Sequence, residues 1–485
     1  MNHEHDHDHN HEHEAESPLS ALNRRNFLKG LGASFATLSL PACDFRPPKE
    51  KIVPYLEKPE NITVGASLWY ASTCAACSAG CGVLVKNRDG RPIKLEGNPD
   101  HPINLGGLCA RGQASILDLY DTERLKAPLI QGNPSSWDII DPEIRQKLSA
   151  IREKKGQIRF LSSSILSPSL LSAVKEFEQV YPTSRHITYD PLSYSAILDA
   201  HAHTHEKRML PWYRLDKAKV LVSFDADFLG TWISPVEFTR SWTTTRKVTK
   251  QNPSISWHIQ LESRLSLTGA SADQRVPLRP SQYFPALLQL SEAITNQLNW
   301  KEKLPTPTSR PLNQPLVEKM ANKLISAKGR SLVLSGVNDL GIQIAVNFIN
   351  HLLENYGTTI DIIKPSLQVQ GNEEEMDRLI AEMNEGTIDA LILYEANPAY
   401  DHSKAEAFRS GMKKVGLTIS LSPRKEETSS LAQYLCPDHH ALESWLDAHP
   451  HYGVYSLYQP VIAPLYKTRS ALESLMAWSG KWSIR

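Results

Sequence analysis

This sequence of 485 residues has no excess of positive or negative charge, because 53 Lys and Arg residues balance 53 Asp and Glu residues. This balance gives no support for binding to nucleic acid or to an anionic membrane surface. Outside the N-terminal region, no apolar run is long enough to span a bilayer. The sequence also lacks a recognisable Ser-His-Asp or paired-carboxylate arrangement, so hydrolytic chemistry has no support.

Cysteine is scarce as well, but four of the six cysteines form a pattern. Cys74, Cys77 and Cys81 follow one another with C-x2-C-x3-C spacing, and Cys109 comes after a gap of 27 residues. Three thiolates from one loop and a fourth from a later turn suit a cubane iron–sulfur cluster. Because thiolate is a soft ligand for iron, we predict that these four cysteines bind a [4Fe–4S] cluster.

Two other interpretations of the cysteines stay open. A zinc site more often shows two C-x2-C pairs or a mixture of Cys and His, whereas a disulfide framework is compatible with an exported chain. Nearby glycines favour the cluster, because a loop around inorganic sulfide needs positive backbone angles and close approach of the main chain. These glycines are Gly80, Gly82, Gly106 and Gly107.

The N-terminal region contains a predicted export signal. Residues 1–22 are rich in His, Asp and Glu; a solvated tail is the simpler interpretation, and loose metal binding is the alternative. Residues 23–43 resemble a twin-arginine (Tat) signal peptide, with Arg24 and Arg25 before a mild apolar run. The run ends in a lipobox-like Leu-Pro-Ala-Cys, which makes Cys43 a candidate for lipidation. We therefore expect a protein at the periplasmic face of the bacterial inner membrane.

Prolines indicate an extended tether at residues 44–65, and a small iron–sulfur domain is predicted to follow at residues 66–125. Within this domain, the segments Val83–Val85 and Pro92–Leu95 predict two short strands. An Asn-Arg-Asp-Gly segment between them is typical of a hairpin turn. The cysteines are therefore expected in loops beside a β-hairpin.

Strands and helices are predicted to alternate after residue 137. The expected strands are 158–161, 186–189, 219–223, 332–334, 390–394 and 417–421. Helices are expected between them, one starting at Asp141-Pro142 as N-cap and first helical residue. This alternation predicts parallel sheets with right-handed crossovers. The expected fold class is α/β, with a small N-terminal iron–sulfur domain and two doubly wound parallel-sheet units.

The two units are predicted at residues 135–300 and 317–465, with a Pro-rich linker near 300–316 and a C-terminal extension at 466–485. Ligands of doubly wound folds bind at the carboxyl ends of strands. Three loops qualify by position: 162–169, 224–230 and 395–400. Since none contains a G-x-G-x-x-G phosphate loop, each is more simply interpreted as a surface loop.

Several motifs together resemble the molybdopterin oxidoreductase family, in the group with a [4Fe–4S] domain and a bis-pterin molybdenum or tungsten cofactor. The motifs are Cys74–Gly82, Gly107–Gln113, Leu119–Arg124, Ser266–Asp273, Leu278–Pro280 and Glu395–Pro398. The resemblance covers residues 66–465. It implies that Arg111, two residues after the fourth cysteine, lies between cluster and pterin and contributes to cofactor binding.

A narrower resemblance is to the molybdoenzyme-like first half of the large iron–sulfur subunit of alternative complex III, a quinol-oxidising assembly. It is carried by Glu50–Tyr55, Ser422–Tyr434, Cys436–Trp445 and Tyr455–Pro460. This resemblance implies three kinds of partner: a ferredoxin-like iron–sulfur subunit, quinol-binding membrane subunits and cytochrome c subunits. No ferredoxin-like set of cysteines follows in this sequence, so a separate polypeptide is expected to supply it.

Two departures from the family pattern argue against bound molybdenum. No cysteine falls near 180–200, where the metal ligand is expected, and Ser193 is more simply a helix-start serine. The last pterin-binding domain is also expected to be lacking.

A further group of residues whose side chains can bind metal comprises Cys436, Asp438, His439 and His440. For this group, a buried thiol and a turn are the simpler interpretation.

These features predict an oxidoreductase subunit more than a stand-alone enzyme. We expect the molybdoenzyme-like, iron–sulfur-binding subunit of a quinol-oxidising respiratory complex, in which the cluster transfers electrons or holds the loop in shape. One alternative is half of a split molybdopterin-dependent oxidoreductase. Another is a docking scaffold without redox chemistry.

Overall fold

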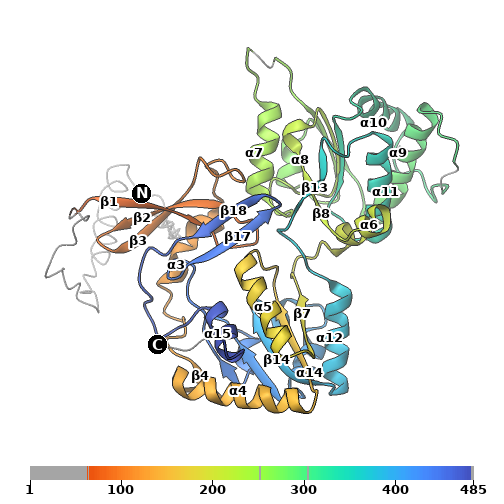
Figure 1. Cartoon of the computed structure of the whole chain (residues 1–485). Helices are drawn as coiled ribbons and strands as arrows, with labels where there is room; N and C mark the ends of the chain where they lie inside the picture. The colour runs from red at the N-terminus through yellow and green to blue at the C-terminus, as the bar shows by residue number, and fades with distance from the viewer. Residues whose placement is uncertain (1–62, 64, 251–252, 303–304, 482–485) are drawn as a thin grey trace, which may run out of the picture. The chain divides into compact units, whose positions relative to one another are not determined.

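Three antiparallel strands form the first sheet of the computed structural model, which describes residues 63, 65–250, 253–302 and 305–481 (Figure 1). The strands are β1 (Ser67–Thr73), β2 (Gly82–Arg88) and β3 (Arg91–Gly97), in the order β1-β2-β3. In the β2–β3 turn, Asp89 and Gly90 have positive φ angles of 51° and 78°, which is typical of a tight hairpin turn that matches the strand twist. The predicted hairpin is therefore confirmed.

Two short helices follow this sheet, α2 (Ala110–Ala114) and α3 (Ile116–Leu119). The sheet and helices share a small core that includes Val83, Val85 and Leu119. This part of the chain carries the four cysteines predicted to bind the cluster. The predicted tail, the signal peptide with Arg24, Arg25 and Cys43, and nearly all of the tether lie outside the described residues.

A seven-stranded sheet has the order β5-β4-β16-β15-β14-β6-β7. Its strands are β4 (Leu129–Ile130), β5 (Asn133–Pro134), β6 (Gln157–Ser162), β7 (Ser184–Thr188), β14 (Ile388–Tyr394), β15 (Leu417–Ser420) and β16 (Tyr434–Leu435). The five strands from β16 to β7 are mutually parallel, whereas β4 runs antiparallel to both of its neighbours.

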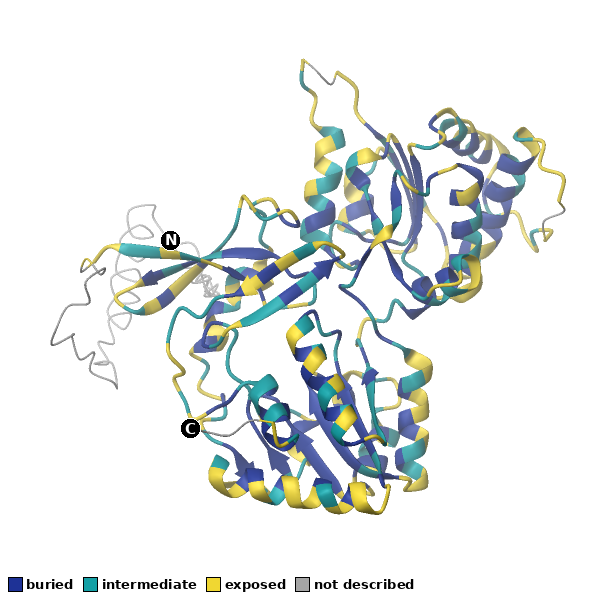
Figure 2. Cartoon of the chain, in the orientation of Figure 1, coloured by how far each residue is buried: buried dark blue, intermediate teal, exposed yellow. Residues whose placement is uncertain are grey.

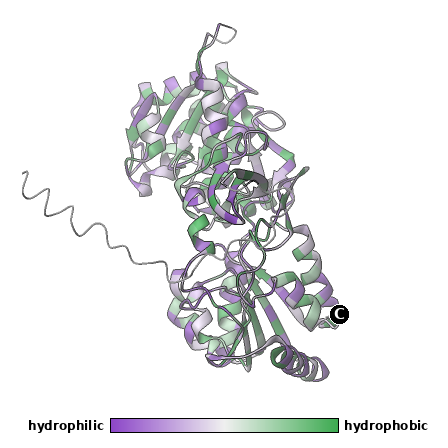
Figure 3. Cartoon of the chain, turned by 90° about the vertical axis from the view of Figure 1, so that its left-hand side faces the viewer, coloured by the Kyte–Doolittle hydropathy of each residue, from purple (hydrophilic) through white to green (hydrophobic). Residues whose placement is uncertain are grey.

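Helices cover both faces of this sheet. They are α4 (Trp137–Glu153), α5 (Pro168–Val180), α12 (Glu373–Glu385), α13 (Pro398–Asp401), α14 (Ala405–Met412) and α15 (Ala471–Trp478), with the 3-10 turn η3 (Ser429–Leu431). In β14, Leu391 and Leu393 pack with α12 and α14, while Ile392 packs with α4, α5 and α15. Alternate residues of a strand face opposite sides, so this apolar strand is buried on both faces (Figures 2 and 3).

A second, wholly parallel sheet has the order β11-β10-β9-β12. Its strands are β9 (Val220–Phe224), β10 (Trp257–Glu262), β11 (Gln274–Pro277) and β12 (Ser331–Ser335). The surrounding helices are α6 (Ser195–His205), η1 (Leu215–Lys217), α7 (Pro235–Arg246), α8 (Leu267–Ser271), η2 (Pro280–Gln282), α9 (Tyr283–Gln297), α10 (Gln314–Ser326) and α11 (Leu340–Leu352). Val222 and Leu221 again belong to cores on opposite faces.

An antiparallel sheet brings distant segments together in the order β18-β17-β13-β8. Its strands are β8 (Leu210–Tyr213), β13 (Ile360–Ser366), β17 (Leu446–His451) and β18 (Val454–Tyr458). The Thr73 hydroxyl at the end of β1 donates a 3.0 Å hydrogen bond to the carbonyl of Leu457 in β18. The β17–β18 hairpin is therefore attached to the first sheet, at the end of the strand that leads into Cys74.

The two parallel sheets are interleaved along the chain. Strands β6 and β7 lie in the same sheet as β14, β15 and β16, and all four strands of the second sheet come from the chain between them. The boundaries expected at 135–300 and 317–465 therefore do not separate the sheets. The Pro-rich segment near 300–316 connects α9 and α10, which pack against each other in one core. It is thus a helix–helix connection, and its prediction as a linker between units was wrong.

The predicted start of the first long helix was also wrong. Helix α4 starts at Trp137 after Ser136, so Pro142 lies inside the helix and Asp141 is not its cap. The Asp141 carboxylate instead accepts hydrogen bonds from Arg469 and from Trp478 Nε1, a tertiary pairing that local pattern does not reveal. Among the described helices, none is long and apolar enough to cross a membrane.

Candidate metal centre

The four cysteines lie in the loop between β1 and β2 and at the start of α2. Cys74 follows β1 and Cys81 precedes β2, and the backbone N–H of Cys74 donates a 2.8 Å hydrogen bond to the carbonyl of Cys81. This bond closes the loop that carries Cys77. Cys109 is the N-cap of α2, where its sulfur accepts from the N–H of Gly112 at 3.4 Å. Cys74 and Cys81 are buried, whereas Cys77 and Cys109 are exposed.

Gly112 shows how closely the two turns approach each other. A methyl group at Gly112 would overlap the side chain of Leu108 and lie 3.5 Å from the sulfur of Cys74. Likewise, a side chain at Gly82 would overlap the ring of His101. The main chain therefore packs tightly around the cysteines, as a cluster-binding loop requires.

The four thiols also lie within one another's electrostatic field. Burial raises the pKa of Cys74 to about 11, with repulsion from Cys77 and Cys109 adding to the shift and Arg111 opposing it. Burial raises the pKa of Cys81 as well, and repulsion from Cys74, Cys77 and Cys109 adds to it. Buried thiolates facing one another are unfavourable unless a cation neutralises them. The arrangement therefore fits the four-thiol ligand set of an iron–sulfur cluster.

The arrangement differs from that of a single-ion site. A tetrahedral zinc site with bonds of 2.3 Å needs sulfurs about 4 Å apart. Among the described residues, no group of three or more His, Cys, Asp or Glu side chains is placed closely enough to hold one metal ion. A cubane cluster sets a weaker condition, because each cysteine binds a different iron. None of the five cysteines in the described ranges forms a disulfide.

The other predicted site residues lie in three different settings. Arg111 is exposed in the first turn of α2, on the side where its charge is felt by Cys74. The Ser193 hydroxyl accepts hydrogen bonds of 3.2 Å from the N–H of Ser195 and from Asn338 Nδ2, so it stabilises the start of α6. Cys436 is fully buried in the core of the seven-stranded sheet. The described residues thus offer no thiol at the position expected for a molybdenum ligand.

The polar neighbours of Cys436 have structural partners. The Asp438 carboxylate accepts from the N–H of Ala471 at 2.9 Å and helps to cap α15, while burial raises its pKa to about 8. A ring nitrogen of His439 pairs with the Thr468 hydroxyl at 2.7 Å, and His440 Nδ1 accepts from the N–H of Leu442 at 3.1 Å. This segment is a set of turns, in agreement with the simpler interpretation of its sequence.

The three predicted strand-end loops do not converge on one pocket. Loops 162–169 and 395–400 follow the neighbouring strands β6 and β14, and Ser163 donates to the Glu395 carboxylate at 3.5 Å. Loop 224–230 follows β9 in the other parallel sheet. A pocket of about 370 Å³ lies beside the first loop and is lined by residues that include Leu166, Gln370 and His449. Glu395 and Asp225 both adopt positive φ directly after their strands.

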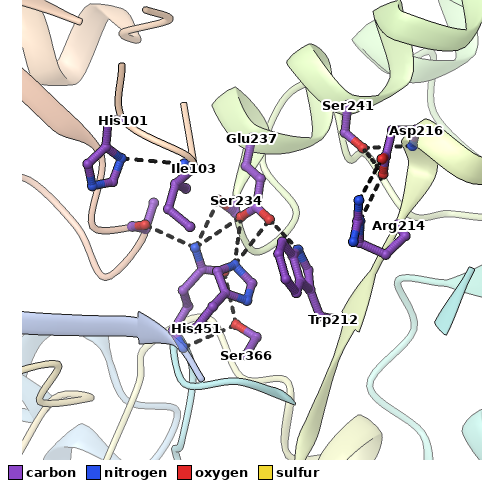
Figure 4. Close-up of polar contacts among 12 residues, drawn as sticks. His101, Ile103, Trp212, Arg214, Asp216, Ser234, Glu237, Ser241, Ser366 and His451 are labelled. Carbon is purple, nitrogen blue, oxygen red and sulfur yellow. Dashed lines mark hydrogen bonds and ion pairs between the residues drawn. The ribbon is translucent and has the colours of Figure 1, made fainter. Parts of the chain in front are cut away.

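Sequence patterns missed two buried polar groups near the cysteines. Glu237 of α7 and His451 of β17 form a pair of 3.1 Å (Figure 4), and Arg124 forms a two-pronged ion pair with Glu443. Their side chains are almost fully buried. The partners lie hundreds of residues apart in sequence, so no local signal pointed to them.

Comparison with known proteins agrees with this geometry. Residues 68–121 match the profile of the molybdopterin oxidoreductase Fe4S4 domain. The chain is 23% identical to the menaquinone reductase molybdopterin-binding-like subunit of Nitratidesulfovibrio vulgaris, over 96% of this chain and 72% of that protein. It is 25% identical to the molybdopterin-containing subunit of the arsenate respiratory reductase of Shewanella sp. strain ANA-3, over 54% of this chain and 31% of that protein.

Two further comparisons concern a shorter region and the fold. A segment covering 28% of the chain is 39% identical to the formate dehydrogenase subunit alpha of Megalodesulfovibrio gigas, of which it covers 15%. The structure of acetylene hydratase from Pelobacter acetylenicus aligns with a TM-score of 0.65 at 13% identity, over 85% of this chain and 69% of that one. This alignment supports the predicted α/β fold.

The fold and the cysteine site together define an oxidoreductase-type α/β protein with an N-terminal Fe4S4 domain. More specifically, residues 68–121 match the Fe4S4 domain of molybdopterin oxidoreductases, and the chain is similar over most of its length to a molybdopterin-binding-like subunit. These similarities support the family expected from the sequence motifs.

Proposed function

We propose that this chain is the molybdoenzyme-like, iron–sulfur subunit of a quinol-oxidising respiratory complex of the alternative complex III type. The observation that carries the proposal is the convergence of four free thiols from two turns, at Cys74, Cys77, Cys81 and Cys109. In the proposed role these cysteines hold a [4Fe–4S] cluster, which accepts and passes on one electron at a time. Cys77 and Cys109 are exposed, and we propose that a partner subunit reaches the cluster from these two residues.

The partner proposal follows from the nature of the relatives. One relative is named as a subunit of a menaquinone reductase, which supports a membrane quinone as the redox partner. We propose that electrons flow from quinol, through a ferredoxin-like subunit and this chain, towards cytochrome c subunits. Quinone is apolar and remains in the membrane, so additional membrane subunits are needed to bind it.

We propose further that the chain works without bound molybdenum. The Ser193 hydroxyl stabilises a helix start, and the fifth described thiol, Cys436, lies in a core away from the cluster loop. Neither is available as a metal ligand without rearrangement. The cofactor-related role proposed for Arg111 then reduces to its charge, which stabilises the nearby thiolates.

Metal and pterin analysis of anaerobically purified protein tests this proposal. We expect about four iron atoms per chain, a reducible electron paramagnetic resonance signal, and neither molybdenum nor pterin. Molybdenum and pterin at one equivalent per chain would instead support a split molybdoenzyme. Protein that folds but contains no iron would support a docking scaffold and contradict the proposal.

For the location, we propose twin-arginine export to the periplasmic face of the inner membrane, with Cys43 lipidated. Changing Arg24 and Arg25 together to Lys is expected to leave the protein in the cytoplasm, because the twin-arginine pair is the export signal. Cell fractionation with immunoblotting checks this outcome, and Lys58→Arg in the predicted tether is the control. Unchanged export of the double variant would exclude this route.

A further inference from the structure

A fully buried asparagine lies between the two turns that carry the cysteines. Asn104 is 0% exposed, and its Oδ1 atom accepts a 2.9 Å hydrogen bond from the N–H of Gly82, the residue after Cys81. Its Nδ2 atom donates to the carbonyl of Gly82 at 2.9 Å and to the carbonyl of Gly107 at 2.7 Å. Gly107 comes two residues before Cys109. One side chain therefore joins the loop of three cysteines to the turn that carries the fourth.

The chemistry of the three partners fixes the orientation of this amide. The N–H of Gly82 needs an acceptor, whereas the carbonyls of Gly82 and Gly107 need donors. An amide turned by a half-rotation would place its oxygen against both carbonyls. Each hydrogen of the NH2 group is used on a different turn, so a side chain with a single donor cannot make the same link.

The turn around Asn104 is also packed closely against the cysteine loop. The ring of His101 (Figure 4) fills the space beside Gly82, where an added side chain would overlap it. His101 Nε2 pairs with the Ser456 hydroxyl of β18 at 2.7 Å, which attaches this part of the turn to the hairpin. The Asn104 side chain then extends the connection from Gly82 to Gly107. The packing leaves little room for the turn to shift while this link is intact.

The fourth cysteine depends on the link more than the other three do. Cys74, Cys77 and Cys81 share one loop, which a main-chain hydrogen bond closes. Cys109 lies on the separate turn, and its sulfur accepts from the N–H of Gly112, which fixes it relative to α2 but not to that loop. Each cysteine of a cubane cluster binds a different iron. A displacement of the Cys109 turn would therefore weaken the binding of one iron.

We infer that Asn104 is a positioning residue for the iron–sulfur cluster, which holds Cys109 at the distance that its iron requires. Asn104 does not bind iron, and it acts through Gly82 and Gly107. Without its two donors, the turn that carries Cys109 moves away from the loop, and the iron at that corner is the first to be lost. This inference rests on the proposed function, because it requires a bound cluster.

Asn104→Asp tests the inference, because it keeps the size and the acceptor of the side chain but removes both donors. Anaerobically purified protein is treated with ferricyanide, just below the amount that damages the wild-type cluster. Loss of one corner converts the [4Fe–4S]²⁺ cluster into a [3Fe–4S]⁺ cluster and Fe²⁺, and ferricyanide accepts the one electron released. The oxidised three-iron cluster is paramagnetic and the oxidised four-iron cluster is not. We expect about three irons and a paramagnetic signal in the variant, and about four irons without that signal in wild type.

Cys109→Ser and Cys81→Ser provide two reference patterns for this experiment. Loss of Cys109 leaves the three loop thiolates in place, so we expect a three-iron cluster. Loss of Cys81 breaks the loop, and we expect no cluster. Asn104→Asp should match Cys109→Ser in iron content and in its electron paramagnetic resonance spectrum. Complete loss of the cluster, or a four-iron cluster as resistant as that of wild type, would overturn the inference.

Asn98→Asp is the matched control. Asn98 precedes Asn104 in the same turn, and its Oδ1 atom accepts from the N–H of Asp100 at 3.0 Å, a bond that the substitution keeps. We expect wild-type iron content and resistance to ferricyanide. Where a buried carboxylate prevents folding of Asn104→Asp, Asn104→Ser takes its place, since a hydroxyl is neutral and has one donor. Equal loss of iron in Asn98→Asp would show that any change in the turn has this effect and would contradict the role of Asn104.

The wild-type protein tests the same geometry without a variant. After a chelator has removed the cluster, the Asn104 link should still keep Cys109 beside the loop. Dibromobimane, which joins two neighbouring thiols, should then connect Cys109 to a loop cysteine, and peptide mass spectrometry identifies the pair. Absence of this connection would overturn the inference. Wild-type protein purified without any cluster would contradict the proposed function instead, so the two failures are distinguishable.

Discussion

Changing Cys81 to serine is expected to abolish cluster binding. Cys81 is 5% exposed and joined to Cys74 through the backbone hydrogen bond that closes the ligand loop. A serine hydroxyl is harder and far less acidic than a thiol, so it is a poor replacement for a thiolate on iron. Without the cluster, repulsion among the remaining thiolates is no longer compensated. We expect iron to fall to a small fraction of the wild-type content, with loss of the electron paramagnetic resonance signal.

Cys436→Ser provides a matched control for this experiment. It is the same substitution at another buried cysteine, in the core of the seven-stranded sheet. Burial of the hydroxyl is expected to lower the free energy of unfolding by about 1–3 kcal/mol, but iron content should stay at the wild-type level. Equal loss of iron in both variants would show that Cys81 acts through folding, and unchanged iron in Cys81→Ser would contradict its assignment as a ligand.

The second large effect is expected at the ion pair between Arg124 and Glu443. The side chains of the two residues are 2% and 0% exposed, and the carboxylate of Glu443 also accepts from the N–H groups of His440 and Leu465. The pair thus joins the end of the cluster domain to the segment around β17. Glu443→Gln leaves the Arg124 charge buried without a counter-charge. Its expected cost is about 3–5 kcal/mol in the free energy of unfolding, measured by urea denaturation.

Glu374→Gln is the control for this variant. Glu374 pairs with Arg378 one turn further along α12, and both side chains are exposed. Exposed helical pairs contribute about 0.3–0.5 kcal/mol, so this variant should unfold almost as wild type does. Similar losses of stability in both variants would contradict the idea that burial makes the Arg124–Glu443 pair more important for stability than an exposed pair.

The pH dependence of the same pair provides an internal check. Burial opposes ionisation of Glu443, but Arg124 and two N–H groups outweigh it and lower the pKa of the carboxyl. A lowered pKa stabilises the fold above the pKa of the unfolded chain, near 4.3, and this stabilisation is lost as pH falls through the folded value. The difference between wild type and Glu443→Gln should therefore shrink in acid.

The cysteine site could be predicted from sequence because its geometry is mostly local. Three of the four predicted ligands lie within one short loop, and Cys109 follows at the start of α2, after β2 and β3. Gly80 and Gly106 do adopt the positive φ expected of them, whereas Gly82 is required for space beside His101. The spacing of the cysteines and the positions of the glycines can both be read directly from the sequence.

Strands were predictable for a similar reason, but their partners were not. The apolar run in β14 shows that the strand is buried on both faces, yet it does not reveal that β6, more than 200 residues earlier, lies beside it. Loop-closure entropy grows only slowly with loop length, so sequence distance constrains pairing weakly. The strands of the second parallel sheet could therefore lie between strands of the first along the chain, and the alternation of strands and helices does not reveal this.

The sequence by itself predicted the four cysteines, the α/β class and a resemblance to the family, because each depends on short motifs or on periodicity within one element. Only the tertiary structure decided which strands share a sheet, that Asp141 pairs with Arg469, and that Glu237 and His451 lie behind the cysteine loop. Those features depend on burial, which brings remote polar groups out of water and makes each require a partner. The identity of that partner cannot be read from the position of one polar residue in the sequence.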